Sequence, residues 1–340
     1  MRLLQQCEII VLYTIIVVLN RMQYNKRRIE GGFQMKQVMI REHSMPAIVQ
    51  GCMRINEMSV EEVEALIKHD LSLGINFFDH ADIYGGGVCE ETFGKVLKKN
   101  PALRENMIIQ SKCGIHRSET NHYDFSKEYI LTCVDEILER LQCGYLDYLL
   151  LHRPDALMEP KEVAHAFDEL YKSGKVKHFG VSNHNPYQIE LLKKEVKQPI
   201  EINQMQMSIM HTPMIDAGVN VNTFDQRAID RDNGTLDYCR LHDITIQCWS
   251  PFQFGMFEGV FLDNPKFPEV NKRVDELAKK YGVSNSTIAV SWLLRHPANM
   301  QVILGSTNIS RIADICKAND FTLTREEWYS IYIAAGNLLP

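Results

Sequence analysis

Short apolar segments alternate with amphipathic segments along nearly the whole chain, and no other sequence feature constrains the fold as much. A short apolar run followed by a longer stretch with helical spacing is typical of a βαβ unit. The sequence predicts strands near Val49–Cys52, Asn76–Asp79, Met107–Ser111, Tyr148–Leu151, His178–Val181, Glu201–Gln204, Thr245–Cys248 and Gln301–Leu304. Eight such units in succession predict an α/β fold of the (β/α)8 TIM-barrel class, whose active site lies at the C-terminal ends of the strands.

Helix start and stop signals support this alternation. Ser59 and Ser126 each stand at the N-cap position of an amphipathic segment. Pro160 lies in the first turn of another helix, and Gly174 follows its end. The other helices are predicted near Cys89–Lys98, Asn185–Val196, Leu236–Leu241, Ser286–Arg295 and Ile309–Ala318. Two longer connections, residues 113–125 and 205–233, are expected to rise over the mouth of the barrel and to shape access to it.

The first 34 residues stand apart from this pattern. Their apolar run, Ile9–Leu19, has 11 residues, which is too short to span a membrane, and no small-residue cleavage site of a signal peptide follows it. Codons for Glu30-Gly31-Gly32 can contain a bacterial ribosome-binding sequence at a suitable distance before Met35, so we expect Met35 to be the true start of translation. We therefore expect residues 1–34 to be an extension that is not native or is disordered, and residues 35–340 to form one barrel domain.

Composition narrows the class of protein. The chain has 37 Lys and Arg against 43 Asp and Glu, a net charge of −6, and no basic block that could follow a phosphate backbone. Its 9 cysteines are scattered without a C-x-x-C pair, which indicates reduced thiols rather than a disulfide framework or a zinc site. We expect a cytoplasmic protein, a monomer or weak homo-oligomer, whose partner is a small-molecule carbonyl substrate and neither a nucleic acid nor a membrane.

Four residues suited to acid–base chemistry stand at consecutive predicted strand ends. Asp79 and Tyr84 follow the second strand, Lys112 ends the third and His152 ends the fourth. An ammonium group beside a phenol lowers the pKa of the phenol, so Lys112 would prepare Tyr84 as a proton donor while Asp79 keeps the lysine charged. His152 would hydrogen-bond the same substrate oxygen. Each residue alone is commonly structural, but their joint placement favours catalysis, and the missing electron source points to a hydride-carrying cofactor.

Seven short motifs resemble the successive signatures of the aldo-keto reductase superfamily. In chain order they are GINFFDHADIYG, SKCG, LLLHRPD, GVSNH, INQMQMS, CWSPF and ILGSTNISRI. The match runs from about Ile48 to the C-terminus, and DHADIYGGG is similar to a bacterial YdhF-like branch. The resemblance implies a barrel that reduces aldehyde or ketone carbonyls to alcohols with NADPH. It also implies that Asp79, Tyr84, Lys112 and His152 form the catalytic tetrad, with Tyr84 as proton donor.

The same resemblance implies a cofactor site. The residues around the nicotinamide and pyrophosphate would be Ser182, Asn183, Gln204, Trp249, Ser250 and Pro251. Those matched at the adenosine end are Gly305, Ser306, Asn308, Arg311 and Asp314. Trp249 stands where the family stacks a tyrosine on the nicotinamide, and Gly305 replaces the family's lysine, which removes one cation from the 2′-phosphate site. Because Arg311 can still pair with that phosphate, NADPH is the expected cofactor and NADH the alternative.

A second class of function stays open, that of an NADP(H)-binding, redox-sensing subunit with little turnover. The substrate is expected to be partly apolar or aromatic, because aromatic residues and Met256 follow Trp249. The residues expected at the substrate are Phe252, Phe254, Met256, Phe257, Met207, His211 and Tyr332.

Overall fold

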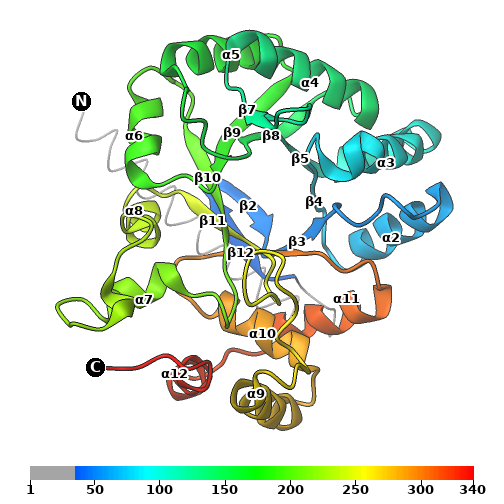
Figure 1. The fold of residues 1–340 in the computed structure, drawn as a ribbon. Coiled ribbons are helices and arrows are strands. Elements are labelled where there is room, and N and C mark those ends of the chain that lie inside the picture. Colours follow the sequence, from blue (N-terminus) through cyan, green and yellow to red (C-terminus); the bar gives the residue numbers. More distant parts are fainter. Residues whose placement is uncertain (1–34) are drawn as a thin grey trace, which may run out of the picture. The chain divides into compact units, whose positions relative to one another are not determined.

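The computed structural model describes residues 35–340, of which Lys36–Pro340 form one compact unit. At its centre a closed barrel of parallel strands runs in the order β10-β11-β12-β3-β4-β5-β8-β9 (Figure 1). The strands are β3 (Ile48–Gly51), β4 (Phe77–Asp79), β5 (Ile108–Cys113), β8 (Leu146–Leu151), β9 (Val176–Ser182), β10 (Ile200–Gln206), β11 (Thr245–Trp249) and β12 (Gln301–Leu304). This confirms the predicted TIM barrel, and each predicted strand is present with its ends shifted by at most two residues. The expectation for residues 1–34 falls outside the described residues.

A ring of helices surrounds the barrel, one after each strand (Figure 1). They are α2 (Val60–Ser72), α3 (Val88–Lys99), α4 (Lys127–Leu141), α5 (Pro160–Lys172), α6 (Pro186–Lys193), α8 (Thr235–Leu241), α10 (Asn285–Leu294) and α11 (Ile309–Cys316). The predicted caps are confirmed: Ser59 and Glu62 form a capping box at α2, and Ser126 accepts a hydrogen bond from the backbone N–H of Tyr129 in α4.

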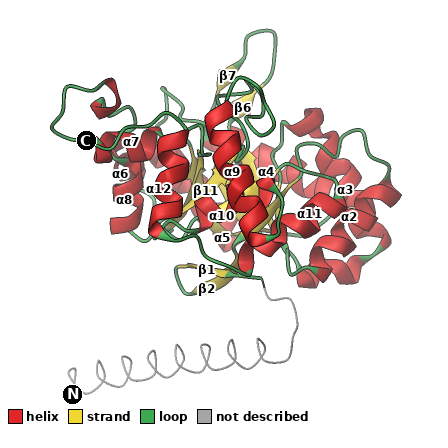
Figure 2. Cartoon of the chain, turned by 90° about the horizontal axis from the view of Figure 1, so that it is seen from below, coloured by secondary structure: helices red, strands yellow, loops and turns green. Residues whose placement is uncertain are grey.

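Several elements were not predicted. Hairpin β1–β2 (Gln37–Ile40 and His43–Pro46) lies at one end of the barrel, and hairpin β6–β7 (Ile115–His116 and His122–Tyr123) lies at the opposite end (Figure 2). The additional helices are α7 (Pro213–Val219), α9 (Pro268–Tyr281) and α12 (Arg325–Ala334), and the short 3₁₀ turns are η1 (Tyr84–Gly87), η2 (Pro101–Asn106), η3 (Gln226–Ala228) and η4 (Lys317–Asn319). The prediction assigned one helix to each strand, whereas two helices follow each of β10 and β11, and α12 follows α11.

The interior of the barrel holds a chain of buried glutamine side chains. Gln110 Nε2 donates to Gln247 Oε1 at 2.9 Å, and Gln247 Nε2 donates to Gln301 Oε1 at 2.9 Å. Gln301 Nε2 then donates to the carbonyl oxygen of Pro46, at 2.7 Å, on hairpin β1–β2. Buried amides are costly unless hydrogen-bonded, so this chain keeps the glutamines in place and ties the hairpin to the barrel.

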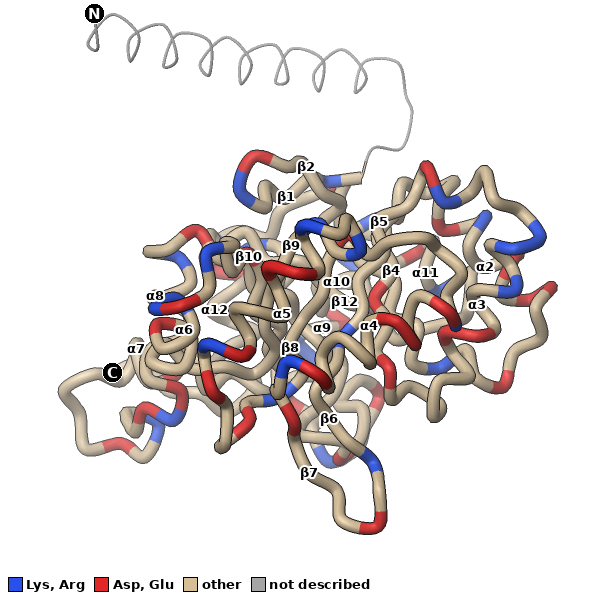
Figure 3. Tube along the Cα trace, turned by 90° about the horizontal axis from the view of Figure 1, so that it is seen from above, with Lys and Arg blue, Asp and Glu red and all other residues tan. Residues whose placement is uncertain are grey.

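Acidic and basic residues are interspersed over the helices and loops (Figure 3). The barrel strands carry fewer of them, and Asp79 of β4 and Lys112 of β5 are buried. Within residues 35–340, no helix has the length and apolar character needed to cross a membrane. The cysteines of the same residues are all buried and unpaired.

The contact between α3 and α4 depends on Gly94, because an added Cβ there would lie 2.0 Å from the carbonyl oxygen of Arg140. We predict that Gly94→Ala lowers the free energy of unfolding by about 1–3 kcal/mol, as overpacking usually does. Urea unfolding at neutral pH measures this. Gly218→Ala in α7 is the matched control, because nothing lies within 4 Å of its Cβ position, and its stability should equal or slightly exceed the wild type. A Gly94→Ala variant as stable as this control would contradict the prediction.

Candidate active site

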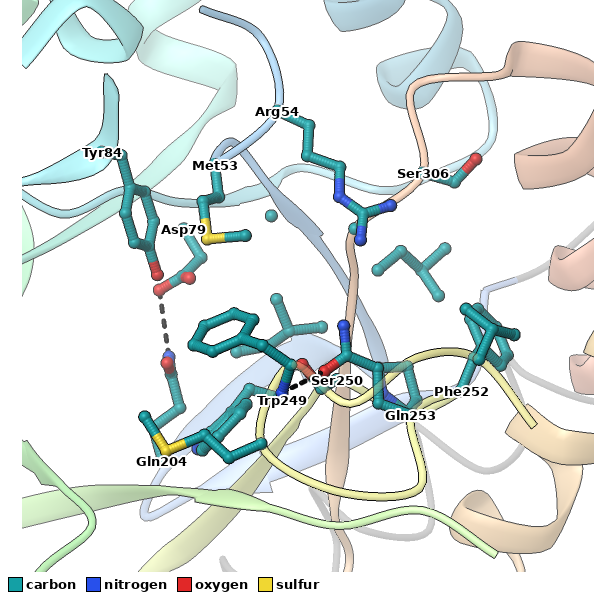
Figure 4. A pocket seen from close by; sticks show the side chains of 18 of the residues that line it. Met53, Arg54, Asp79, Tyr84, Gln204, Trp249, Ser250, Phe252, Gln253 and Ser306 are labelled. Atoms are coloured by element: carbon teal, nitrogen blue, oxygen red, sulfur yellow. Dashed lines mark hydrogen bonds between the residues drawn. The ribbon is translucent and has the colours of Figure 1, made fainter. Parts of the chain in front are cut away.

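A cavity of about 1260 Å³ opens at the C-terminal end of the barrel, which is called the mouth below (Figure 4). Residues at or beyond the C-terminal ends of all the barrel strands line it. This is the end at which enzymes of this fold class carry their active sites. The cavity therefore lies at the end of the barrel where the predicted catalytic residues stand.

Lys112 of β5 contacts two of the other predicted catalytic residues. Its Nζ donates to Asp79 Oδ2 at 2.8 Å, to the carbonyl oxygen of His80 at 2.7 Å and to Tyr84 Oη at 3.0 Å. The lysine side chain is fully buried and Asp79 is 2% exposed. All three ammonium hydrogens thus have acceptors, which satisfies a charge that would otherwise be expensive to bury.

The carboxylate of Asp79 is fixed from its other side by glutamines. Its Oδ1 accepts from Gln110 Nε2 at 2.6 Å and from Gln204 Nε2 at 3.0 Å. Gln204 Nε2 also donates to Gln247 Oε1 at 3.0 Å, so Asp79 is joined to the glutamine chain of the barrel interior. The carboxylate therefore holds a single orientation toward Lys112.

The position of Tyr84 follows from the glycines after it. Gly85, Gly86 and Gly87 have φ values of +58°, +66° and +96°, which a residue with a Cβ adopts only with strain. This turn begins directly after Tyr84 and lets the chain pass from β4 into α3 while the tyrosine side chain lines the cavity. The rings of Tyr84 and His152 meet edge-on with centroids 6.1 Å apart, so His152 joins the same cluster.

Burial sets the protonation of this cluster. Burial opposes the charge of Lys112, but Asp79 and Tyr84 outweigh it, so the pKa of Lys112 is raised above its usual range. Burial also raises the pKa of Tyr84, and the charge of Lys112 offsets that effect only in part. The expectation that Lys112 brings the pKa of Tyr84 down was wrong in its net direction, because it left out desolvation. Tyr84 consequently carries its proton at neutral pH.

His152 is neutral. Burial is the main cause that holds the pKa of its imidazole well below the usual range, and the charges of Lys112, Arg153 and Arg117 add to the effect. A neutral imidazole has one N–H donor, and the buried Nδ1 has no hydrogen-bond partner among the described residues. His152 lines the cavity, so the other ring nitrogen is the one suited to face a ligand there.

The residues predicted around the nicotinamide come together on one wall of the cavity. Asn183 Nδ2 donates to Ser182 Oγ at 2.8 Å, and Ser182 Oγ donates to the Gln204 carbonyl oxygen at 2.9 Å. Trp249 Nε1 donates to Asn183 Oδ1 at 3.2 Å. Asn183 and Ser250 have φ values of +59° and +52°, a region that residues other than glycine enter at a cost and that is common at functional sites. Pro251 lines the cavity next to Ser250.

At the predicted adenosine end, four of the five residues line the cavity: Gly305, Ser306, Arg311 and Asp314. Asn308 is not part of the lining, and its Oδ1 instead accepts from the backbone N–H of Arg311 and caps α11. Although partial burial opposes its charge, hydrogen bonds from Lys317, Ser284 and Thr287 lower the pKa of Asp314 to about 2.

Three arginines in the lining were not predicted as site residues: Arg54, Arg117 and Arg153. A Cβ at Gly305 would lie 3.9 Å from Cζ of Arg54, so the guanidinium stands beside the position left without a side chain. Figure 4 shows Arg54 extending into the cavity near Ser306. Nothing in the sequence around Arg54 signals this, whereas Arg153 could have been found because it directly follows His152.

The expected substrate residues are only partly correct. Phe252, Met256 and Phe257 line the cavity, but Phe254 packs against Phe267 instead, with ring centroids 4.9 Å apart. The lining includes none of Met207, His211 and Tyr332.

None of residues 205–233 lines the cavity, so the prediction that this connection shapes access to it is not supported. They form α7 and η3, and Asp216 of α7 accepts from Tyr332 Oη of α12 at 2.7 Å. This connection is therefore held by the C-terminal helix. The other long connection, residues 113–125, does line the cavity, through hairpin β6–β7.

Comparison with known proteins agrees with this geometry. The family model of the Aldo/keto reductase family matches residues 47–335. The chain belongs to the Aldo/keto reductase family. It is 34% identical to the oxidoreductase YdhF of Escherichia coli over 284 residues, which cover 82% of this chain and 89% of YdhF. It is also 34% identical to a 6-dehydroglucose reductase of Agrobacterium fabrum over 299 residues, which cover 85% of this chain and 93% of that reductase.

Solved structures share the fold of this reductase family. A Klebsiella pneumoniae aldo-keto reductase crystallised in complex with NADPH superposes with a TM-score of 0.69 at 20% identity. The superposition covers 90% of this chain and 97% of the other. At this level of identity the likeness concerns the barrel itself.

Removing Lys112 should leave the Asp79 carboxylate buried without its cation. We predict that Lys112→Met lowers the free energy of unfolding by about 3–5 kcal/mol, the usual cost of breaking a buried pair. Urea unfolding at pH 7 measures it. The double variant Asp79→Asn/Lys112→Met should recover a large part of the loss, because it leaves no buried charge. Equal stability of Lys112→Met and the wild type would show that the pair is not a buried charge pair in solution.

Proposed function

We propose that this aldo-keto reductase is an NADPH-dependent oxidoreductase that reduces an aldehyde or ketone carbonyl of a small molecule to an alcohol, with Tyr84 as proton donor. The observation that carries the proposal is the contact of Lys112 Nζ with both Asp79 and Tyr84 Oη at the edge of the cavity. A protonated phenol beside a buried ammonium is suited to give its proton to a developing alkoxide.

The residues of the cavity fit a nicotinamide dinucleotide. Both amide hydrogens of Gln204 are used by Asp79 and Gln247, which leaves its Oε1 to accept from a carboxamide. The indole of Trp249 provides a flat face for a ring. Ser310 and Arg311 at the first turn of α11 line the cavity, where the backbone N–H of Ser310 and the guanidinium of Arg311 suit a phosphate. When bound, the reduced nicotinamide supplies the hydride.

The side chains of this chain divide the remaining work. As hydride adds to the carbonyl carbon, Tyr84 gives its proton to the carbonyl oxygen, and Lys112 stabilises the phenolate that remains. Neutral His152 donates a hydrogen bond to the same oxygen and orients the carbonyl. Asp79 contacts no substrate in this scheme and keeps Lys112 charged and aimed, so it acts as a positioning residue.

Because one relative is a 6-dehydroglucose reductase, sugar-like aldehydes are among the first substrates to test. A panel of aldehydes, ketones and quinones would separate this proposal from the alternative of a redox-sensing subunit. Consumption of NADPH with any of them supports the reductase. Tight NADPH binding without consumption would favour the sensor.

Replacing Tyr84 with phenylalanine should remove the proton donor and leave the ring in place. We predict a loss of about 100- to 10,000-fold in kcat for carbonyl reduction, with the Kd for NADPH within about twofold of the wild type. Loss of NADPH absorbance measures turnover, and fluorescence titration measures binding. Tyr187→Phe is the matched control, because Tyr187 is 74% exposed on α6 and lies outside the cavity lining. Unchanged kcat in Tyr84→Phe would remove Tyr84 from the mechanism.

Arg54 should supply the cation that Gly305 lacks. We predict that Arg54→Ala raises the Kd for NADPH about tenfold, and that Gly305→Lys in the same chain restores part of the affinity. Titration with NADPH and NADH distinguishes two contacts. A rise in Kd for NADPH alone assigns the guanidinium to the 2′-phosphate, whereas an equal rise in Kd for both cofactors assigns it to the pyrophosphate. Arg325→Ala, on the exposed start of α12, is the control. An unchanged Kd for both cofactors would exclude Arg54 from the cofactor site.

A further inference from the structure

Three hydrogen-bond donors gather beside His152 and have no role in the scheme above. Arg153 directly follows His152 at the end of β8, and its Cζ lies 5.7 Å from the ring centroid of Trp249. Arg117 and Tyr123 belong to hairpin β6–β7 and line the same cavity. We call Arg117, Tyr123 and Arg153 the donor cluster.

The guanidinium groups of this cluster have no acidic partner. Neither Arg117 nor Arg153 forms an ion pair or a hydrogen bond with another side chain in residues 35–340. The acidic side chains of the cavity lining are engaged elsewhere: Asp79 with Lys112, Asp263 with Asn285 Nδ2 at 3.0 Å and Asp314 with Lys317 at 2.6 Å. The wall next to His152 therefore carries uncompensated positive charge.

Arg153 is partly removed from water, whereas Arg117 is exposed, and neighbouring groups respond to both charges. Burial lowers the pKa of Arg153, and the nearby phenol of Tyr123 opposes that shift. Both guanidinium groups also lower the pKa of His152. A partly buried cation without a counter-ion, such as Arg153, is unfavourable, and a bound anion would relieve it.

The phosphates of a dinucleotide cannot be that anion if they lie where the proposed function places them. Arg54 follows β3, and Gly305 and Arg311 follow β12. In the circular order of the barrel, β8 lies four strands from β12, which is directly across the mouth. The backbone of Arg153 thus lies across the mouth from the phosphate-binding residues and beside His152, and its guanidinium reaches toward Trp249 of β11.

We propose that the donor cluster is an anion subsite, and that the natural substrate is a carbonyl compound carrying a carboxylate or phosphate group away from its carbonyl. This inference rests on the proposed function. Planar guanidinium groups bind both anions through paired N–H donors, and the phenol hydroxyl adds a further donor. Held there, the anion would leave the carbonyl end of the substrate free to reach Tyr84 and His152.

Matched substrate pairs test the proposal in the complete enzyme with NADPH. Succinic semialdehyde and methyl 4-oxobutanoate share a carbon chain and differ in charge, as do glyceraldehyde 3-phosphate and glyceraldehyde. We expect kcat/KM for the anionic member of at least one pair to exceed that of the neutral member by about tenfold or more. The pair that shows the preference identifies the carboxylate or the phosphate as the favoured group.

Variants locate the effect. Arg153→Gln and Arg117→Gln should each reduce the ratio of kcat/KM for the anionic and neutral members about tenfold, and Arg153→Lys should retain part of it. Arg325→Gln is the control on the exposed start of α12 and should leave the ratio unchanged.

Three outcomes would overturn the inference. The neutral members could be reduced as efficiently as the anions. Alternatively, the ratio could survive both glutamine variants, or Arg153→Gln could raise the Kd for NADPH while leaving the ratio intact, which would assign Arg153 to the cofactor. By contrast, an enzyme that reduces none of the four compounds and no carbonyl of the broader panel would contradict the proposed function itself.

Discussion

The buried charge pair of Asp79 and Lys112 is the interaction on which the site depends. Two unlike charges between adjacent strands of a barrel are stable only if their remaining hydrogen-bonding capacity is satisfied. The carbonyl oxygen of His80 and the phenol of Tyr84 accept from the ammonium, while Gln110 and Gln204 donate to the carboxylate. The same contacts that offset the cost of burial also aim Lys112 at the tyrosine, so stability and orientation have one origin.

The arginines at the mouth fall into two groups. Arg54 and Arg311 stand near β3 and β12, and Arg117 and Arg153 stand near β5 and β8 across the mouth. Tyr84 follows β4, and His152 stands beside Arg153 at the end of β8. Such an arrangement suits a reaction in which a phosphorylated cofactor and an anionic substrate meet with their reactive ends together and their charges apart.

The strand ends could be predicted from the sequence because the alternation of apolar and amphipathic segments and the order of the motifs are local signals. Those signals are enough to single out Asp79, Tyr84, Lys112 and His152 as candidate catalytic residues. Helix α9 also has local signals, with Pro268 at its start and Gly282 after its end, but two helices lie between β11 and β12 where one was predicted, so α9 was missed. The proximity of Arg54 to Gly305 could not be predicted, because it arises only when β12 pairs with β3 and closes the barrel. Likewise, the pKa direction of Tyr84 depends on burial, which motif order does not report.

The glutamine chain limits where protons can travel. From Asp79 it runs through Gln110, Gln247 and Gln301 to the carbonyl oxygen of Pro46, so the axis of the barrel is hydrogen-bonded from the site to the hairpin at the far end. Carboxamides donate and accept hydrogen bonds but do not exchange their protons readily at neutral pH, so this path insulates rather than conducts. Under the proposed function, Tyr84 would then recover its proton from the solvent side of the cavity. Reprotonation is thereby tied to the opening through which substrate and product pass.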